Sequence, residues 1–112
     1  MRRGDIYLVK KGDPRDPKKQ RPFVVISRQA LIDSTFPTVI CAPIVTNFIP
    51  GIATQVVIDE HAGLKHRSAV LCDGLLSIPK SALTDYKGSL SDAHLAEVDA
   101  ALLEALGLCN GL

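Results

Sequence analysis

Arg21 is the residue of this chain whose surroundings best suit chemistry on a phosphate. It directly precedes Pro22 and the apolar run at residues 23–26. A proline fixes φ and has no N–H to donate, so Pro22 fits the start of a strand and holds Arg21 at the rim of a sheet. A planar guanidinium in such a place can grip two phosphate oxygens at once. A lone arginine before a proline is more often a surface cation that closes a strand, so the rest of the chain must show whether Arg21 binds a phosphate.

A second polar pair stands further along the chain. Thr46 and Asn47 follow a predicted strand at Thr38–Val45 and begin a turn that extends to Gly51. The hydroxyl and the amide can both hydrogen-bond a phosphate or a base. A free hydroxyl is a poor acid or base, so the groups that would transfer protons stay unassigned.

The charge is divided unevenly along the chain. Residues 1–28 hold nine Lys or Arg against three Asp, whereas residues 29–112 hold four Lys or Arg against nine Asp or Glu. Such a division indicates a localised basic patch that binds a polyanion, with a solvated charged loop as the alternative.

The cysteines and histidines predict no metal site and no cofactor. Cys41 and Cys72 lie inside apolar runs, Cys109 lies near the end, and none forms a C-x-x-C pair. The three histidines show no ligand spacing with them. We expect buried, reduced thiols and, since no apolar run is long enough to span a bilayer and none resembles a signal peptide, a cytoplasmic protein.

The length of 112 residues allows one core, and we expect a single domain over residues 1–112. Short β-rich runs predict strands at residues 6–9, 23–27, 38–45, 54–59, 68–72 and 75–79, with a break at Asp73 and Gly74. The run at 23–27 is continuously apolar, so its strand should be central, with both faces covered. Pro43 predicts that the second half of its strand lies at an edge or a bulge. Residues 10–21 predict a basic loop, and residues 28–34 a helical turn or an irregular excursion.

The C-terminal part changes to a helical period. Ser89, Ser91 and Asp92 suit a helix N-terminus, and Gly107 suits the residue after its end. The apolar positions between them recur every three or four residues, at Leu95, Val98, Leu102 and Leu106. The prediction is a mainly β fold of five or six short strands, curved into a small barrel and closed by one terminal helix.

Several segments, in this order, resemble the MazF/PemK-type toxins of type II toxin–antitoxin systems. They are Gly4-Asp5-Ile6-Tyr7, residues 21–27, residues 42–47, Gly63-Leu64-Lys65-His66-Arg67-Ser68, Cys72-Asp73 and Leu83-Thr84-Asp85-Tyr86. The resemblance implies an SH3-like barrel of the MazF/CcdB-like plasmid maintenance toxin fold. It also implies a homodimer, an antitoxin protein as partner, and metal-independent, sequence-selective cleavage of single-stranded RNA. The family's catalytic arginine and threonine correspond to Arg21 and Thr46.

One departure from the family pattern concerns the hydroxyl. In several members it falls two residues after the strand proline, where this chain has Val45, and Thr46 is one residue further on. Adjacent strand residues point to opposite faces, so the direction of Thr46 depends on a bulge or on the turn itself.

If the polyanion is RNA, the remaining polar residues form two groups, those that would attract its backbone and those that would contact its bases. Lys18, Lys19, Lys65 and Arg67 would attract the RNA backbone, while Gln20, Asn47 and Gln55 would read splayed bases. We interpret His66 as an RNA-contacting residue, although imidazole also titrates in the range useful for catalysis. Phe48 is the best stacking platform, with burial as its alternative. Asp73 pairs with Arg21 or Arg67, or else it only forms a turn with Gly74.

Two other functions fit a barrel of this kind. The first is a CcdB-like toxin that poisons gyrase through exposed apolar C-terminal residues. The second is a non-catalytic RNA-binding barrel, which the valine at position 45 suggests.

Overall fold

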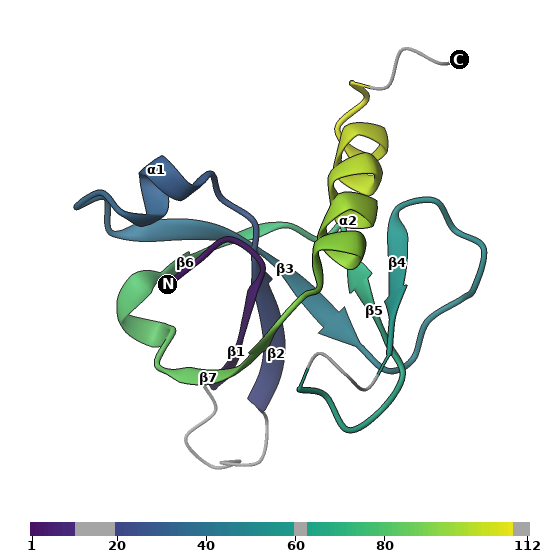
Figure 1. Ribbon diagram of the computed structural model, residues 1–112, viewed down its shortest axis with the longest axis horizontal. Helices are drawn as coiled ribbons and strands as arrows, with labels where there is room; N and C mark the ends of the chain where they lie inside the picture. The colour runs from purple at the N-terminus through teal and green to yellow at the C-terminus, as the bar shows by residue number, and fades with distance from the viewer. Residues whose placement is uncertain (11–19, 60–62, 109–112) are drawn as a thin grey trace.

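A computed structural model describes residues 1–10, 20–59 and 63–108 of the chain. Figure 1 shows a strongly curled antiparallel sheet with a C-terminal helix across one of its faces. The strands are β1 (Asp5–Lys10), β2 (Gln20–Val25), β3 (Thr38–Val45), β4 (Gln55–Ile58), β5 (Ser68–Leu71), β6 (Leu76–Pro79) and β7 (Asp85–Ser89). The helices are α1 (Gln29–Ile32), the 3-10 turn η2 (Lys80–Ala82) and α2 (Asp92–Ala105). This confirms the predicted mainly β fold with a terminal helix.

The strands follow the order β4-β5-β3-β2-β1-β7, and β6 also pairs with β3. β3 is therefore the strand with the most neighbours. On one side it pairs with β2, while on the other side β6 pairs with residues 38–41 and β5 with residues 44–45. The β5–β6 segment thus bends along one side of β3, and the break predicted at Asp73 and Gly74 is confirmed as a turn in which the Gly74 N–H donates to the Leu71 carbonyl.

Both faces of the sheet are covered, and β2 shows why. Val24 packs into the cluster beneath α2, whereas Phe23 and Val25 pack into a second cluster on the opposite face with Ile78 and Leu83. Successive strand residues point to opposite sides, so a continuous apolar run is stable only when both sides are buried. The central position predicted for this run is confirmed.

Helix α2 closes the first cluster. Its N-cap is Ser91, whose hydroxyl accepts a hydrogen bond from the His94 N–H, and Gly107 follows its end with φ +70°. Val98 and Ala101 are buried on the face that packs against the sheet. Leu106, which the helical spacing placed on this apolar face, is instead the C-cap residue after the helix ends at Ala105, and it is 59% exposed.

Strand β7 is the element that the sequence analysis missed. The described residues contain seven strands rather than the five or six expected. β7 reads Asp-Tyr-Lys-Gly-Ser and is almost entirely exposed, so it carries no apolar alternation that could have revealed it. It is stabilised by backbone pairing to β1, with an irregularity between Ile6 and Tyr7.

The two described cysteines are free thiols in the core, as predicted. Burial raises the pKa of Cys41 to about 12. Burial and, secondarily, the charge of Asp73 raise the pKa of Cys72 to about 11. Across residues 1–10, 20–59 and 63–108, no helix has the length and hydropathy of a bilayer-crossing segment.

Candidate functional site

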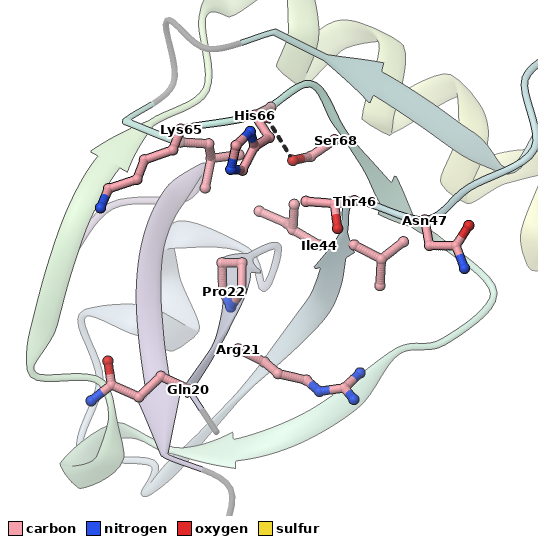
Figure 2. A pocket seen from close by; sticks show the side chains of 11 residues that line it. Gln20, Arg21, Pro22, Ile44, Thr46, Asn47, Lys65, His66 and Ser68 are labelled. Carbon is pink, nitrogen blue, oxygen red and sulfur yellow. Dashed lines mark hydrogen bonds between the residues drawn. The ribbon is translucent and has the colours of Figure 1, made fainter. Parts of the chain in front are cut away.

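Arg21 and Thr46 line the same hollow of about 590 Å³. Three segments form its walls (Figure 2): the start of β2, the end of β3 with the bend that follows, and the chain leading into β5. Its lining residues are Gln20, Arg21, Pro22, Ile44, Val45, Thr46, Asn47, Leu64, Lys65, His66 and Ser68.

Two prolines explain why the sheet opens at this point. The pairing of β2 with β3 runs from Val25 and Cys41 to Phe23 and Pro43, where it ends. Pro22 is the next residue of β2, and neither proline has an N–H with which to continue the ladder. β3 then pairs only with β5, through Ile44 and Val45, which leaves its other side unpaired. The edge predicted for the second half of β3 is confirmed, and this edge forms one wall of the pocket.

Arg21 lies within β2 rather than before it. Its backbone pairs with Val9 of β1, so the side chain extends from a rigid element, and it is exposed. Among the residues that the structure describes, no hydrogen bond or ion pair is recorded for its guanidinium. The cation is therefore available to an anion in the pocket.

Thr46 lies in the bend just after β3 ends at Val45. Strand alternation no longer governs its direction there, so the one-residue offset from the family pattern does not turn it away. Figure 2 shows its hydroxyl directed toward the side of the pocket on which Arg21 lies. Val45 also lines the pocket, and it is half-buried.

The third wall is held at both of its ends. The Ser68 hydroxyl donates to the His66 carbonyl at 2.8 Å, and Ser68 pairs with Ile58 in the β4–β5 ladder. At the other end, Gly63 has φ +81° and lies so close to β7 that a Cβ would stand 2.0 Å from the Lys87 carbonyl oxygen. Only glycine permits this approach. Lys65 and His66 are thus carried on a fixed segment.

The pocket is cationic. Arg21 and Lys65 line it, and within the part of the chain that the structure describes no Asp or Glu does. Its base is apolar, with Ile44 only 3% exposed. An anion bound there meets positive charge without competing carboxylates, which suits a phosphodiester.

The structure brings five of the predicted residues together with Thr46: Gln20, Arg21, Asn47, Lys65 and His66. Gln55 lies elsewhere, since it lines a separate hollow beside α2 and its side-chain oxygen accepts from the Ile49 N–H at 3.4 Å. Lys18 and Lys19 lie outside the described residues.

Three further side chains, those of Arg67, Phe48 and Asp73, make contacts that the sequence did not predict. The guanidinium of Arg67 lies 6.0 Å from the centre of the Phe48 ring, next to the pocket rather than in it. Asp73 accepts a hydrogen bond from the Thr54 hydroxyl at 2.7 Å. Its predicted pairing with Arg21 or Arg67 is therefore wrong, because the turn at Gly74 places it beside β4 instead, and the turn-forming alternative is confirmed.

Leu64 and Ser68 line the pocket although their residue types did not predict it. Leu64 packs against the α2-side core and Ser68 is buried, so neither has reactive chemistry that would single it out. Only their place in the segment at residues 63–68, which resembles the toxin family, pointed to the site.

Comparisons with known proteins agree with this geometry. A family model described as "PemK-like, MazF-like toxin of type II toxin-antitoxin system" matches residues 2–106. Endoribonuclease MazF3 of Mycobacterium tuberculosis (strain ATCC 25618 / H37Rv) is 36% identical over 89 residues, which cover 80% of this chain and 81% of that protein. A probable endoribonuclease MazF of Mycolicibacterium smegmatis is 28% identical over 110 residues, covering 98% of this chain and 100% of that one.

Solved structures show the same fold. The Mycobacterium tuberculosis toxin MazF-mt6 superposes with a TM-score of 0.78 at 28% identity, covering 94% of this chain and 98% of that chain. A mycobacterial endoribonuclease in complex with its cognate antitoxin superposes with a TM-score of 0.82 at 26% identity, covering 96% and 95%.

Proposed function

The chain belongs to the PemK-like, MazF-like toxin family of type II toxin–antitoxin systems, and we propose that it is an endoribonuclease whose reaction takes place in the pocket of Arg21 and Thr46. The observation that carries the assignment to this pocket is the meeting of an unpaired guanidinium and a hydroxyl in a hollow lined by cations and, among the described residues, by no carboxylate.

The proposed reaction uses the RNA's own 2′-hydroxyl as nucleophile. It attacks the adjacent phosphorus in line with the departing 5′-oxygen, so that a 2′,3′-cyclic phosphate and a 5′-hydroxyl form. Arg21 donates hydrogen bonds to the phosphate oxygens and stabilises the negative charge that develops on them. Thr46 donates a hydrogen bond to the same phosphate and holds it for attack. Because the nucleophile belongs to the substrate, no metal-bound water is required.

The remaining pocket residues suit a single strand. Lys65 attracts the phosphate backbone, and His66 contacts the RNA. Gln20 and Asn47 have donors and acceptors that can pair with the edges of unstacked bases, which a duplex would hide. We assign the sequence selectivity to these two residues, and attraction of the RNA backbone to Lys18, Lys19 and Arg67. Gln55, on the other side of the bend, is not part of this set.

A cognate antitoxin is the protein partner that we propose. The solved complex of a similar endoribonuclease with its cognate antitoxin supports it. We further propose that the protein is cytoplasmic and acts as a homodimer, consistent with the large exposed apolar side chains Phe36, Leu103, Leu106 and Leu108.

The decisive experiment compares Arg21→Ala with the wild type on a long unstructured RNA in the presence of EDTA. Wild-type protein should cut at defined sites that primer extension can map. Arg21→Ala should lose about 10²–10³ in rate, the usual effect of removing one preorganised donor to a developing charge. Arg28→Ala is the matched control, since Arg28 is exposed and does not line the pocket.

Intact RNA with folded wild-type protein across varied sequences would refute the proposal. Trapped gyrase–DNA complexes without RNA cleavage would support the gyrase reading, and RNA binding without cleavage at any protein excess would support the non-catalytic barrel. Leu103, Leu106 and Leu108 are exposed, as the gyrase alternative requires, but that alternative gives no role to the cationic pocket that joins Arg21 to Thr46.

A further inference from the structure

His66 is, among the described residues that line the pocket, the one with a side chain of the type that titrates near neutral pH. We propose that His66 is the general acid of the reaction and gives a proton to the departing 5′-oxygen. This inference rests on the proposed endoribonuclease function and deepens it, because Arg21 and Thr46 alone leave the proton transfers unexplained.

The other polar side chains of the pocket suit this task poorly. A guanidinium does not lose its proton in proteins, which excludes Arg21. Lysine ammonium groups ordinarily titrate near pH 10 and hydroxyls are weaker acids still, so Lys65, Thr46 and Ser68 would donate slowly. Amides such as Gln20 and Asn47 do not act as acids. Imidazole has the matched acidity that efficient proton transfer needs.

The position of His66 also fits. Its main chain is fixed, because its carbonyl accepts from the Ser68 hydroxyl at 2.8 Å and the same segment is anchored through Gly63 against β7. No hydrogen bond of its ring is recorded among the described residues. In Figure 2 the imidazole and the Arg21 guanidinium stand on opposite sides of the pocket, with the Thr46 hydroxyl between them in this view. A phosphate held by Arg21 and Thr46 would thus present one of its bridging oxygens to His66.

The described charged side chains that line the pocket with His66 are cations, so an anion beside the ring must come from the substrate. Arg21 of β2 and Lys65 of the same wall are cations in the pocket, and Arg67 lies next to it on the Phe48 ring. Asp59 follows Ile58, the β4 partner of Ser68, and does not line the pocket. A bound phosphodiester would supply an anion beside the imidazole, and an adjacent anion favours the protonated form that neighbouring cations oppose.

The step balances without any further reactant. The 2′-oxygen forms a bond to phosphorus and its proton passes to water. The bond between phosphorus and the 5′-oxygen breaks, and its electron pair takes the proton from the imidazolium. Solvent then reprotonates the imidazole for the next turnover.

The test compares His66→Gln with the wild type on two oligoribonucleotides that carry one mapped cut site. One has the ordinary 5′-oxygen at the scissile phosphate, and the other has a bridging sulfur in its place. On the oxygen substrate the variant should lose about 10²–10⁴ in rate, the usual contribution of a general acid. On the sulfur substrate it should cut nearly as fast as the wild type, because a thiolate leaves without needing a proton.

The pH dependence gives a second readout. The ratio of wild-type to His66→Gln rates on the oxygen substrate should fall as pH rises between about 5 and 8, since only a protonated imidazole can donate. Lys65→Gln, on the same wall, should instead lose equally on both substrates. His94→Gln, on α2 and outside the pocket, should leave both rates unchanged.

Equal losses of His66→Gln on the two substrates, or a variant as active as the wild type, would overturn the role of His66 while leaving the endoribonuclease intact. Absence of cleavage by the wild type on either substrate would instead refute the proposed function itself. Because His66 is exposed, the thermal unfolding temperature of the variant should match that of the wild type.

Discussion

At the scale of single residues, the hydroxyl of Thr46 depends on where a strand ends. β3 stops at Val45, and the bend that follows carries Thr46 into the pocket with Arg21. A valine thus stands at the last strand position, and the hydroxyl comes from the first residue of the bend. In the proposed reaction this hydroxyl binds a charged phosphate, and such hydrogen bonds contribute about 1.5–3 kcal/mol.

Thr46→Val should therefore slow cleavage by about 10- to 100-fold with little change in folding, since a loss of ~1.4 kcal/mol corresponds to a factor of ten. Thr46→Ser, which keeps the hydroxyl, should stay within a few-fold of the wild type. Single-turnover rates on one oligoribonucleotide measure this. A Thr46→Val variant as fast as the wild type would show that the hydroxyl at position 46 has no part in the reaction.

The buried thiols give a residue-scale prediction about stability. Burial raises the pKa of Cys41 from 9.0 to about 12 and contributes most to raising that of Cys72 to about 11. In the unfolded chain both thiols ionise near their ordinary pKa, so above it the unfolded state binds fewer protons than the folded state. The thiols' stabilising contribution is complete below about pH 9 and is lost as pH rises from there toward 11 and 12.

Urea unfolding midpoints should therefore fall between pH 8 and pH 11. The double variant Cys41→Ala/Cys72→Ala, although less stable overall, should show a shallower fall over the same range. Identical pH slopes in the two proteins would show that other groups, such as tyrosines and lysines, account for the whole effect.

At the scale of elements, the pocket exists because three segments separate and are then held apart. Pro22 and Pro43 end the pairing of β2 with β3, and the segment before β5 is fixed by the close approach of Gly63 to β7. β7 thus contributes no side chain to the pocket but positions one of its walls. An exposed strand of polar sequence has a functional consequence that its composition does not show.

Gly63→Ala should disturb this wall more than an ordinary glycine replacement. The new Cβ would stand 2.0 Å from the Lys87 carbonyl oxygen, so the backbone must shift, and φ is +81°. We expect a loss of unfolding free energy above the ~1–2 kcal/mol that a positive φ alone costs, together with slower RNA cleavage. Chemical denaturation and the cleavage assay measure the two effects.

Gly51→Ala is the matched control, because Gly51 has φ +88° but no atom within 4 Å of its added Cβ. It should lose only the conformational term, about 1–2 kcal/mol, and keep full cleavage. Equal effects of the two substitutions on both measurements would contradict the role that we give to the contact with β7.

At the scale of the whole molecule, charged side chains of opposite sign gather in different places on the surface. The described cations Arg21 and Lys65 meet in one hollow, while carboxylates such as Glu97 and Glu104 line a different hollow beside α2. The nearly neutral net charge of +1 therefore conceals, among the described residues, a cationic region at the pocket and an acidic region beside α2. RNA binding should depend on salt through the cationic region only.

Lys65→Gln should weaken RNA binding and reduce the slope of log K against log salt by about 0.7, the value for one phosphate contact on a single strand. Glu104→Gln should leave the slope unchanged, because Glu104 lies on the acidic side. Fluorescence anisotropy of a labelled, uncleavable oligonucleotide in a salt series measures both. A slope unaffected by Lys65→Gln would place the RNA path outside this pocket.

Local patterns in the sequence determined most of the secondary structure of this protein. Six of the seven described strands, the helix with its Ser91 cap and Gly107 end, and the burial of residues 23–25 follow from apolar periodicity and from caps that act within a few residues. The resemblance of ordered segments pointed to the family and to Arg21.

The tertiary structure alone decided which polar residues meet. Arg21, Thr46 and His66 are brought together by the register of β2, β3 and β5, whereas the same pairings carry Gln55 toward α2 and Asp73 to Thr54. β7 became visible only through its pairing with β1. Such contacts join residues far apart in the chain, and a polar side chain carries no periodic signal of the partner it will find, so only the folded sheet determines them.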